Sequence, residues 1–251
     1  MIILENISAG YGKYRVLHGI SAHFENKRLI SVIGPNGSGK STLFKVMSGL
    51  IPCTGGSIFA DNESLSGLNR RGIAKSISYL SQSKGIPDMT VAQMVLHGRF
   101  PYLAYPRRYR ESDRKIAYEA MKTLGIEKLA DTPLYALSGG MRQTAYIAMA
   151  LAQDTDHILL DEPTTYLDIS HQIALSKTLR SLADSGKCVI SVMHDLVLAL
   201  NISDDILVLD KGCAVAFGTP GEIFNSGIID RVFGISLDFN ENGYNYKYPP
   251  R

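Results

Sequence analysis

The chain has 251 residues, 45% apolar and 20% charged, which is the composition of a folded globular protein rather than of a disordered one. Its 26 basic and 24 acidic residues leave a net charge of +2, which gives no sign of a protein that coats nucleic acid but leaves room for a local basic patch. Three cysteines without CxxC spacing predict neither a disulfide framework nor a cysteine-rich zinc site. No apolar run approaches the ~18 to 20 residues that span a bilayer, and the first seven residues do not resemble a signal peptide.

The first third of the chain is predicted to form short strands. Apolar or alternating runs cover residues 2–8, 16–24 and 29–33, and glycines or Glu25-Asn26 separate them. The third run leads directly into a glycine-rich loop at 34–39, and a helix is expected over 40–49. Further strands are expected over 57–60 and 77–80.

Helical periodicity dominates after Gln82. It covers residues 90–98, 111–124 and 139–153, with Thr90 and Ser112 as the expected N-caps of the first two helices. Buried strands are then predicted over 157–160, 189–192, 206–209 and 214–217, with a helix over 170–184. This alternation predicts an α/β core interrupted by a helical insert at about residues 84–155. The polar, tyrosine-rich stretch 237–251 is expected to be an edge segment or a loose end.

The glycine-rich loop fits a phosphate-binding pattern. Gly34-Pro-Asn-Gly-Ser-Gly-Lys-Ser-Thr42 matches G-x-x-x-x-G-K-[ST], with the strand before it and the helix after it that this motif requires. Glycines let several N–H groups face one phosphate, and the following helix adds its positive end. A lysine places a cation on the β- and γ-phosphates, and a serine hydroxyl reaches Mg²⁺. The residues expected to bind the nucleotide here are Asn36, Gly37, Ser38, Gly39, Lys40, Ser41 and Thr42.

Two carboxylates end the predicted strand at 157–160. Asp161 lies where it can bind Mg²⁺ directly or through water, and Glu162 is suited to act as a general base toward the γ-phosphate. Asp-Glu-Pro after a strand is also a common turn. Paired with the phosphate loop, however, it predicts a nucleotide hydrolysis site.

The segment Leu137-Ser-Gly-Gly-Met-Arg-Gln143 resembles the signature motif of ATP-binding-cassette (ABC) ATPases. It lies about twenty residues before the acidic strand, as in that family, and the resemblance covers nearly the whole chain. It implies an α/β P-loop NTPase fold in a single ABC ATPase domain. Residues 1–83 and 156–236 would form an N-terminal antiparallel β subdomain and a parallel-sheet core, 84–155 a helical subdomain and 237–251 a C-terminal tail.

Other positions match the family's remaining motifs. The resemblance implies that Tyr11 stacks on adenine, and that Gln82 belongs to the Q-loop and contacts Mg²⁺ and the attacking water. His194 matches the switch histidine that contacts the γ-phosphate. Thr165-Tyr-Leu-Asp168 matches the D-loop. The other histidines are expected to be structural, and they are His18, His23, His97, His157 and His171.

In this family the signature motif completes the ATP site of the opposite subunit. The resemblance therefore implies a head-to-tail dimer with a second copy of the chain, in which Ser138, Gly139 and Gly140 donate to the γ-phosphate across the interface. Asp168 is expected to contribute to the same nucleotide site. Met141 stands where the family usually has glutamine, and a thioether is a weaker acceptor and no donor.

Two classes of ABC protein share these motifs, the soluble ABC ATPases and the ATPase subunits of transporters. Soluble ABC ATPases usually carry a long coiled-coil insert or two fused cassettes, and this chain has neither, so a transporter subunit is favoured. The stretches His97 to Tyr102 and Pro163 to Gln172 resemble importers of iron–siderophores, haem and cobalamin, with zinc or manganese importers as the alternative. We expect polytopic permease subunits as partners, a substrate-binding protein acting indirectly, no nucleic acid, and a peripheral position on the cytoplasmic face of the inner membrane.

One segment suggests where the permease binds. Residues 99–110 are rich in arginine and aromatic side chains, and in the family the region after the Q-loop docks a short cytoplasmic helix of the permease. Phe100, Tyr102 and Tyr105 are expected to line that groove, because aromatic and arginine side chains are favoured at interface hot spots. The alternative is a solvated loop with one or two packed aromatic side chains.

Overall fold

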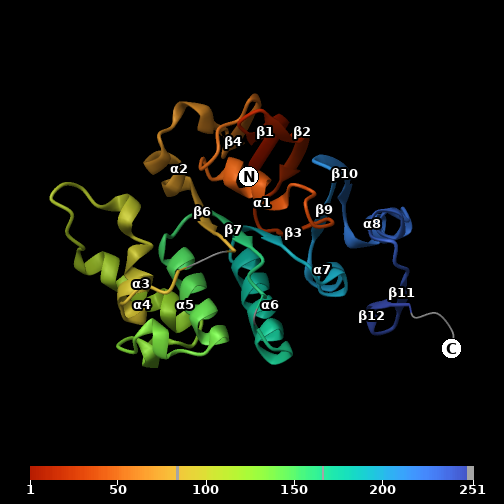
Figure 1. Cartoon of the computed structure of the whole chain (residues 1–251). Helices are drawn as coiled ribbons and strands as arrows, with labels where there is room; N and C mark the ends of the chain where they lie inside the picture. Colours follow the sequence, from red (N-terminus) through yellow and green to blue (C-terminus); the bar gives the residue numbers. More distant parts are fainter. Residues whose placement is uncertain (83–84, 166, 248–251) are drawn as a thin grey trace.

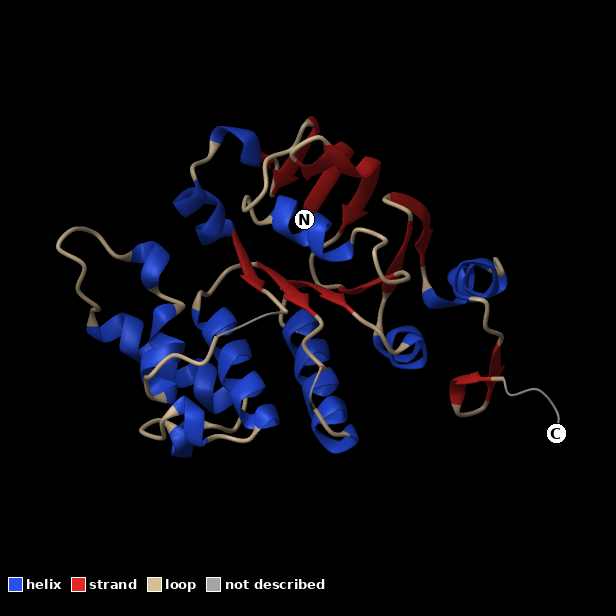
Figure 2. Ribbon diagram, in the orientation of Figure 1, coloured by secondary structure: helices blue, strands red, loops and turns tan. Residues whose placement is uncertain are grey.

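Three layers of secondary structure stack in the computed structural model, which describes residues 1–82, 85–165 and 167–247 (Figures 1 and 2). The middle layer is a six-stranded sheet in which only β10 runs antiparallel to its neighbour. In order across the sheet its strands are β10 (Cys213–Gly218), β9 (Asp205–Asp210), β3 (Leu29–Ile33), β8 (Cys188–Val192), β7 (His157–Asp161) and β6 (Ile77–Leu80). All six were predicted from the sequence to within two residues at each end.

Both faces of this sheet are buried, which explains the continuous apolar runs of its central strands. In β3, Ile30 and Val32 pack into the core on one side, and Leu29 and Ile33 pack into the core on the other. The same alternation holds in β7, β8 and β9, because neighbouring side chains of a strand point to opposite faces.

One face is covered by an antiparallel sheet and by α1 (Lys40–Met47). The order of the sheet is β2 (Tyr14–Phe24), β1 (Ile2–Tyr11), β4 (Gly55–Ala60) and β5 (Glu63–Ser64). Ile2 pairs with Phe24 on one side and with Ala60 on the other, and all three side chains are buried. Figure 1 shows this layer above the six-stranded sheet.

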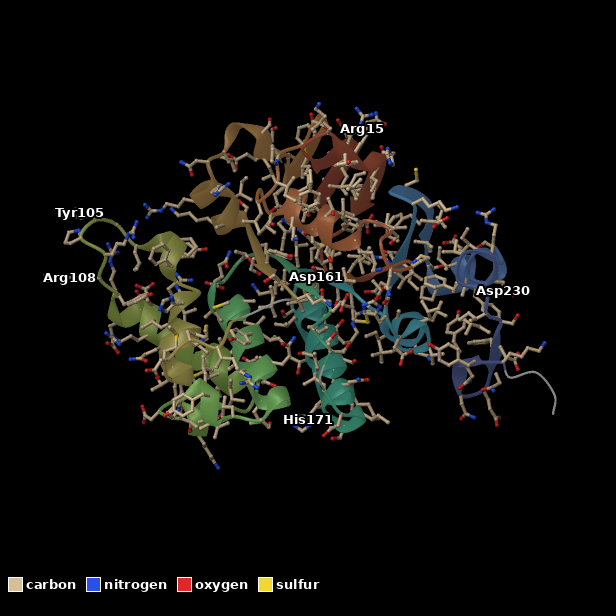
Figure 3. All side chains as sticks on the ribbon, viewed as in Figure 1. Arg15, Tyr105, Arg108, Asp161, His171 and Asp230 are labelled. Atoms are coloured by element: carbon tan, nitrogen blue, oxygen red, sulfur yellow. The ribbon has the colours of Figure 1, made fainter. Side chains whose placement is uncertain are left out.

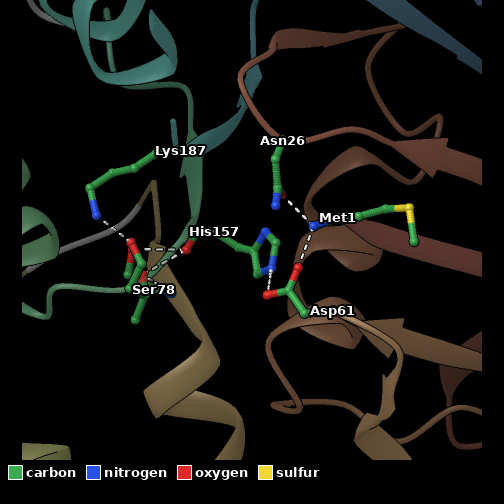
Figure 4. A network of polar contacts seen from close by, with 7 residues as sticks. Met1, Asn26, Asp61, Ser78, His157 and Lys187 are labelled. Atoms are coloured by element: carbon green, nitrogen blue, oxygen red, sulfur yellow. Dashed lines mark hydrogen bonds and ion pairs between the residues drawn. The ribbon is translucent and has the colours of Figure 1, made fainter. Parts of the chain in front are cut away.

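A polar contact joins the antiparallel layer to the start of β7 (Figure 4). The His157 side chain is completely buried, and its Nε2 lies 2.8 Å from Oδ2 of Asp61 in the β4–β5 turn. The same carboxylate pairs with the Met1 ammonium at 2.5 Å. Burial lowers the pKa of His157, and the Asp61 carboxylate only partly offsets this, so the imidazole is held neutral.

Helices cover the opposite face of the six-stranded sheet. They are α3 (Val91–His97), α4 (Glu111–Thr123), α5 (Gly139–Ala152), α6 (Ile169–Asp184) and α7 (Leu196–Ile202), and α3 to α5 pack on one another. Short 3₁₀ turns connect or extend them at η2 (Phe100–Tyr102), η3 (Glu127–Leu129) and η4 (Leu134–Ala136). None of the helices in the described ranges is both long enough and apolar enough to cross a bilayer.

One predicted cap is wrong. Thr90 caps α3 as expected, through a reciprocal pair of hydrogen bonds with Gln93. The N-cap of α4 is Arg110 rather than Ser112, because the Asp113 carboxylate accepts the Arg110 N–H at 2.9 Å and so fixes the first turn earlier in the chain. That carboxylate also binds the buried Arg99 guanidinium at 3.1 Å.

Several short elements were not predicted. They are η1 (Leu65–Gly67), α2 (Arg70–Ser76), α7, α8 (Pro220–Asn225) and α9 (Ile228–Phe233). Each helix is seven residues or shorter, which is too few to display a full 3.6-residue periodicity, and packing rather than intrinsic propensity holds such helices.

The C-terminal stretch differs from the expected edge segment or loose end. Its described part pairs with itself as a hairpin of β11 (Leu237–Asn240) and β12 (Gly243–Tyr246), while residues 248–251 lie outside the described residues. The side-chain amide of Asn201 in α7 bonds both the N–H and the carbonyl of Tyr244, each at 3.1 Å. The hairpin is thereby docked on α7.

Candidate active site

The phosphate-loop motif lies between β3 and α1, as predicted. Gly34 begins it, and a side chain at this position would come within 2.2 Å of the Leu209 carbonyl oxygen, so only glycine fits against β9. Gly39 ends it as the N-cap of α1, with φ of 102° in the region that favours glycine. These two glycines let the backbone curl at the positive end of α1.

Two polar side chains of the loop are placed to bind an anionic ligand. The buried Lys40 ammonium donates to the carbonyls of Gly34 at 2.7 Å and Pro35 at 3.0 Å, so it lies across the loop itself. Burial lowers the pKa of Lys40, and the carboxylates of Glu162 and Asp161 partly offset this. The Ser38 hydroxyl is buried and bonds to nothing within the described part of the chain. A phosphate would give the ammonium a counter-charge and the hydroxyl a partner.

Asp161, at the end of β7, faces the loop. Its carboxylate accepts a hydrogen bond from the Ser41 hydroxyl at 3.2 Å and one from the Tyr79 hydroxyl at 3.3 Å. Burial raises the pKa of Asp161, and these two bonds only partly offset it. A divalent cation would favour the charged form, since Mg²⁺ is usually held by one or two carboxylates together with the oxygens of a phosphate.

Glu162 lies at the centre of a small polar cluster. One carboxylate oxygen accepts from the Gln82 amide at 2.5 Å and from the Thr165 hydroxyl at 3.4 Å. The other lies 2.5 Å from Nε2 of His194. Glu162 has φ of 55°, in the left-handed region that a non-glycine residue rarely adopts. Residues far apart in the chain are therefore brought to one carboxylate.

Loop and cluster line the same cavity, which has a volume of about 630 Å³. Nine of its ten lining residues were predicted from the sequence, and they are Asn36, Gly37, Gly39, Lys40, Ser41, Thr42, Gln82, Glu162 and His194. The tenth, Val16 of β2, was not predicted. Nothing in the sequence marks it, because an apolar residue in a predicted strand normally belongs to a core.

Tyr11 lies close to α1, with the Lys45 ammonium 5.9 Å from the centre of its ring. The side chain is about half exposed, so it is accessible to a ligand. The sequence did not predict Lys45 and Tyr79, which both act to lower the pKa of Asp161. The hydroxyl of Tyr79 reaches Asp161 because β6 pairs in parallel with β7, and that pairing was not fixed by the sequence.

The remaining predicted residues do not line this cavity. Ser138 and Gly139 lie at the start of α5, where the Ser138 hydroxyl caps the helix by accepting the N–H of Met141 at 3.3 Å. Gly140 follows in the first turn. Asp168 caps α6 by accepting the N–H of His171 at 2.9 Å, and its bonds with His171 and Ser170 lower the pKa of Asp168 to about 2. Tyr166, within the predicted D-loop, lies outside the described residues.

The cavity suits a nucleoside triphosphate better than a free metal ion. Among the described residues no group of three or more His, Cys, Asp or Glu side chains could hold a metal ion. A cation would therefore need phosphate oxygens to complete its coordination by Ser41 and Asp161. The loop supplies backbone N–H groups, a lysine and an unpaired hydroxyl for those phosphates.

Comparisons with known proteins agree with this geometry. A family model described as ABC transporter matches residues 17–165. The ferric enterobactin transport ATP-binding protein FepC of Escherichia coli (strain K12) is 40% identical over 233 residues, which are 92% of this chain and 86% of that one. The iron(3+)-hydroxamate import ATP-binding protein FhuC of Bacillus subtilis (strain 168) is 36% identical over 93% of this chain and 88% of its own.

Solved structures show the same fold. The chain from an inward-facing transporter described as putatively of the metal-chelate type superposes with a TM-score of 0.83, at 25% identity, over 98% of this chain and 97% of that one. The bacterial ABC transporter cassette MJ0796, solved as a dimer, gives a TM-score of 0.77 at 28% identity over 88% and 99%. The chain belongs to the ABC transporter family as an ATP-binding subunit, whose members bind and hydrolyse ATP.

Proposed function

We propose that this chain is the ATP-hydrolysing subunit of an importer for ferric siderophores or related metal chelates. The observation that carries the catalytic part is the Glu162 carboxylate, held between Gln82 and His194 at the cavity of the phosphate loop. The cargo is inferred from the relatives, since FepC and FhuC are named for ferric enterobactin and iron(3+)-hydroxamate and each matches more than nine tenths of this chain.

In this proposal the loop from Asn36 to Thr42 holds the phosphates of ATP, and Tyr11 stacks on the base. Lys40 turns from its own backbone carbonyls to the β- and γ-phosphates. Ser41, Gln82 and Asp161 would hold Mg²⁺, which would neutralise the negative charge of the phosphates.

Glu162 takes the role of general base, orienting a water toward the γ-phosphate and accepting its proton. Gln82 contacts one oxygen of this carboxylate and His194 contacts the other. From that position His194 would reach the γ-phosphate. In the structure these two side chains occupy the carboxylate oxygens. Each carboxylate oxygen has two lone pairs, so the oxygen that contacts His194 can also accept a hydrogen bond from the attacking water.

The second half of each ATP site comes from another copy of the chain. Ser138, Gly139 and Gly140 stand at the N-terminus of the 14-residue helix α5, whose first N–H groups have no partner within the helix. Donors at a positive helix end suit a γ-phosphate presented by a partner. With Asp168 at the start of α6, a head-to-tail dimer would sandwich two ATP molecules, and the dimeric solved cassette supports this arrangement.

The chain works as one ABC ATPase domain attached to permease subunits at the cytoplasmic face of the inner membrane. Residues 1–83 and 156–236 form the nucleotide-binding core of this unit, 84–155 its helical subdomain and 237–251 its tail. A substrate-binding protein delivers the chelate to the permease, so the ATPase never contacts the cargo.

Co-purification tests this proposal. A tagged Glu162→Gln chain is isolated with ATP from membranes of the native host, beside a Lys40→Ala chain as the control that binds nucleotide poorly. We expect a polytopic permease with the first chain. That permease, reconstituted with the unchanged chain, should take up a ferric siderophore in preference to zinc or manganese. Recovery of only soluble nucleic-acid or ribosomal partners would overturn the transport function, and preferred uptake of zinc would overturn the cargo.

A further inference from the structure

Two segments of the chain that contact each other concentrate positive charge. Residues 99–110 include four arginines and no acidic residue, against a net charge of +2 for the whole chain. Residues 70–76, in α2, add three further cations and again no acidic residue. The two segments therefore form a local excess of charge that the chain as a whole does not have. Their exposed members, which we call the arginine face, are Arg70, Arg71, Lys75, Arg107, Arg108 and Arg110.

Specific contacts hold the two segments together. The Arg71 guanidinium donates to the carbonyls of Pro101 at 2.7 Å and Leu103 at 2.6 Å. The Lys75 ammonium lies 5.7 Å from the centre of the Tyr102 ring, which also carries the Arg99 guanidinium at 4.0 Å. The arginine face is thus a built surface rather than a chance gathering of mobile side chains.

Carboxylates do not neutralise this face. Elsewhere the chain pairs its arginines, as Arg28 does with Asp205 and Arg180 with Asp204. Within the described ranges, no member of the arginine face forms an ion pair with a carboxylate. Asp113, a neighbour in sequence, is already bound by the buried Arg99.

The aromatic side chains of this segment have different surroundings, so they do not act alike. Tyr102 is occupied by two cations, and the ring of Phe100 carries the Arg107 guanidinium at 4.7 Å. Tyr105, in contrast, is 96% exposed. Figure 3 shows Tyr105 and Arg108 on the loop before α4, which extends beyond the helices at the edge of the molecule. The tip therefore presents one exposed tyrosine, followed closely by the exposed Arg107 and Arg108.

We propose that the arginine face and Tyr105 contact the anionic phospholipid headgroups of the membrane in which the permease lies. This inference rests on the proposed function, which places the chain at a membrane surface. Phosphate groups complement the arginine face in charge, and a tyrosine ring is favoured at the depth of the headgroups. A projecting tip fits a planar, fluid surface.

The lipid contact gives the chain an orientation. Electrostatic attraction to anionic lipids acts within about 10 Å at moderate ionic strength. It is therefore strongest when the loop before α4 faces the bilayer. Binding to lipid at this single face would present the same side of every copy of the chain to the permease before the two proteins meet.

Vesicle binding tests the proposal without the permease. The chain is sedimented with vesicles of phosphatidylglycerol and phosphatidylcholine in equal parts, and with vesicles of phosphatidylcholine alone. We expect binding only to the first, and weaker binding as salt is raised. Arg107→Ala/Arg108→Ala should bind about 30-fold more weakly, at about 1 kcal/mol for each basic side chain near an anionic surface. Arg107→Lys/Arg108→Lys should keep most of the binding, since a diffuse negative surface requires charge rather than fork geometry.

A matched control tests whether the position of the two arginines matters, or only the net charge of the chain. Lys177→Ala/Arg231→Ala removes two exposed cations from α6 and α9, and it should bind anionic vesicles as the unchanged chain does. Equal losses in the two double variants would overturn the proposal, as would binding to phosphatidylcholine alone or no binding at all. So would capture by permease in phosphatidylcholine vesicles that is lost in Arg107→Ala/Arg108→Ala, because the partner would then be the protein.

A fluorescent reporter adds a direct readout, because the chain contains no tryptophan. Tyr105→Trp should shift its emission to shorter wavelength on anionic vesicles, while Tyr14→Trp, at a position 82% exposed on the antiparallel sheet, should not. Unshifted emission from the Tyr105→Trp chain would contradict insertion of the tip. ATP hydrolysis by Arg107→Ala/Arg108→Ala should be unchanged, so loss of lipid binding and failure of the proposed ATPase function are told apart.

Discussion

Glu162→Gln isolates the proposed chemical step from binding of the nucleotide. The substitution replaces one carboxylate oxygen by an NH₂ group and keeps the volume of the side chain. One acceptor oxygen remains for Gln82, which donates to Glu162 at 2.5 Å, and the Thr165 hydroxyl is another donor within reach. The cavity should therefore keep its shape while losing its base.

The expected loss follows from the role of the carboxylate. General base catalysis contributes about 10² to 10⁴ in rate, which is about 3 to 5 kcal/mol at 1.36 kcal/mol for each tenfold change. Affinity for ATP should be equal or higher, because one negative charge that faces the triphosphate is removed. Turnover should fall while affinity for ATP does not, whereas general damage to the fold would lower both.

Two assays check this prediction. Phosphate release at saturating ATP reports turnover, and fluorescence of a ribose-labelled ATP analogue reports binding. Glu63→Gln, the same chemical change at an exposed position of β5, should alter neither. Turnover of Glu162→Gln at the unchanged rate would refute the role of Glu162 as base. Loss of both turnover and binding would mean that the carboxylate serves to hold the cavity together.

Three further changes probe the loop, the helical layer and the contact between layers. Lys40→Ala should weaken ATP binding, measured with the same labelled analogue. Unchanged affinity would mean that this loop does not bind the phosphates of ATP. Arg99→Ala should lower the free energy of unfolding in urea by about 3 to 5 kcal/mol, because the buried Asp113 carboxylate keeps the Arg110 N–H but loses its counter-charge. Loss of the more exposed pair of Arg28 should cost at most about 1 kcal/mol. Burial lowers the pKa of His157, so the unfolded chain binds the proton more readily; stability should be full above about pH 6.5 and fall as pH drops below it. His157→Asn should flatten that decline in thermal unfolding, and an equally steep decline in the variant would assign it to other groups.

Much of the fold could be predicted because its central strands and long helices carry strong local signals. The runs at 29–33 and 157–160 are buried throughout, as strands covered on both faces must be, and the helix at 139–152 spans nearly four turns. The short helices were missed since their positions are set by packing. The N-cap at Arg110 was missed for a related reason, because Asp113 is fixed from the far side by Arg99.

The site could be predicted residue by residue only where a motif encodes it. Glycine-rich loops bind phosphate through their backbone, so residue type and spacing suffice for the segment from Gly34 to Thr42. Tyr79 has no such signal, because its contact with Asp161 depends on which strand lies beside β7. The register of parallel strands distant in sequence is a tertiary property, and a single sequence does not display it.

The left-handed backbone at Glu162 has a consequence for how this position tolerates change. Left-handed conformation costs a side-chain-bearing residue of order 1 kcal/mol or more, which glycine avoids. Glycine or asparagine at this position would therefore relieve the backbone and abolish the proposed chemistry. Selection for thermal stability alone, applied to a randomised library of this chain, should replace Glu162. The selected proteins should be more stable and should not hydrolyse ATP. At this one residue, the backbone conformation favours glycine for stability, whereas the proposed ATP hydrolysis requires glutamate.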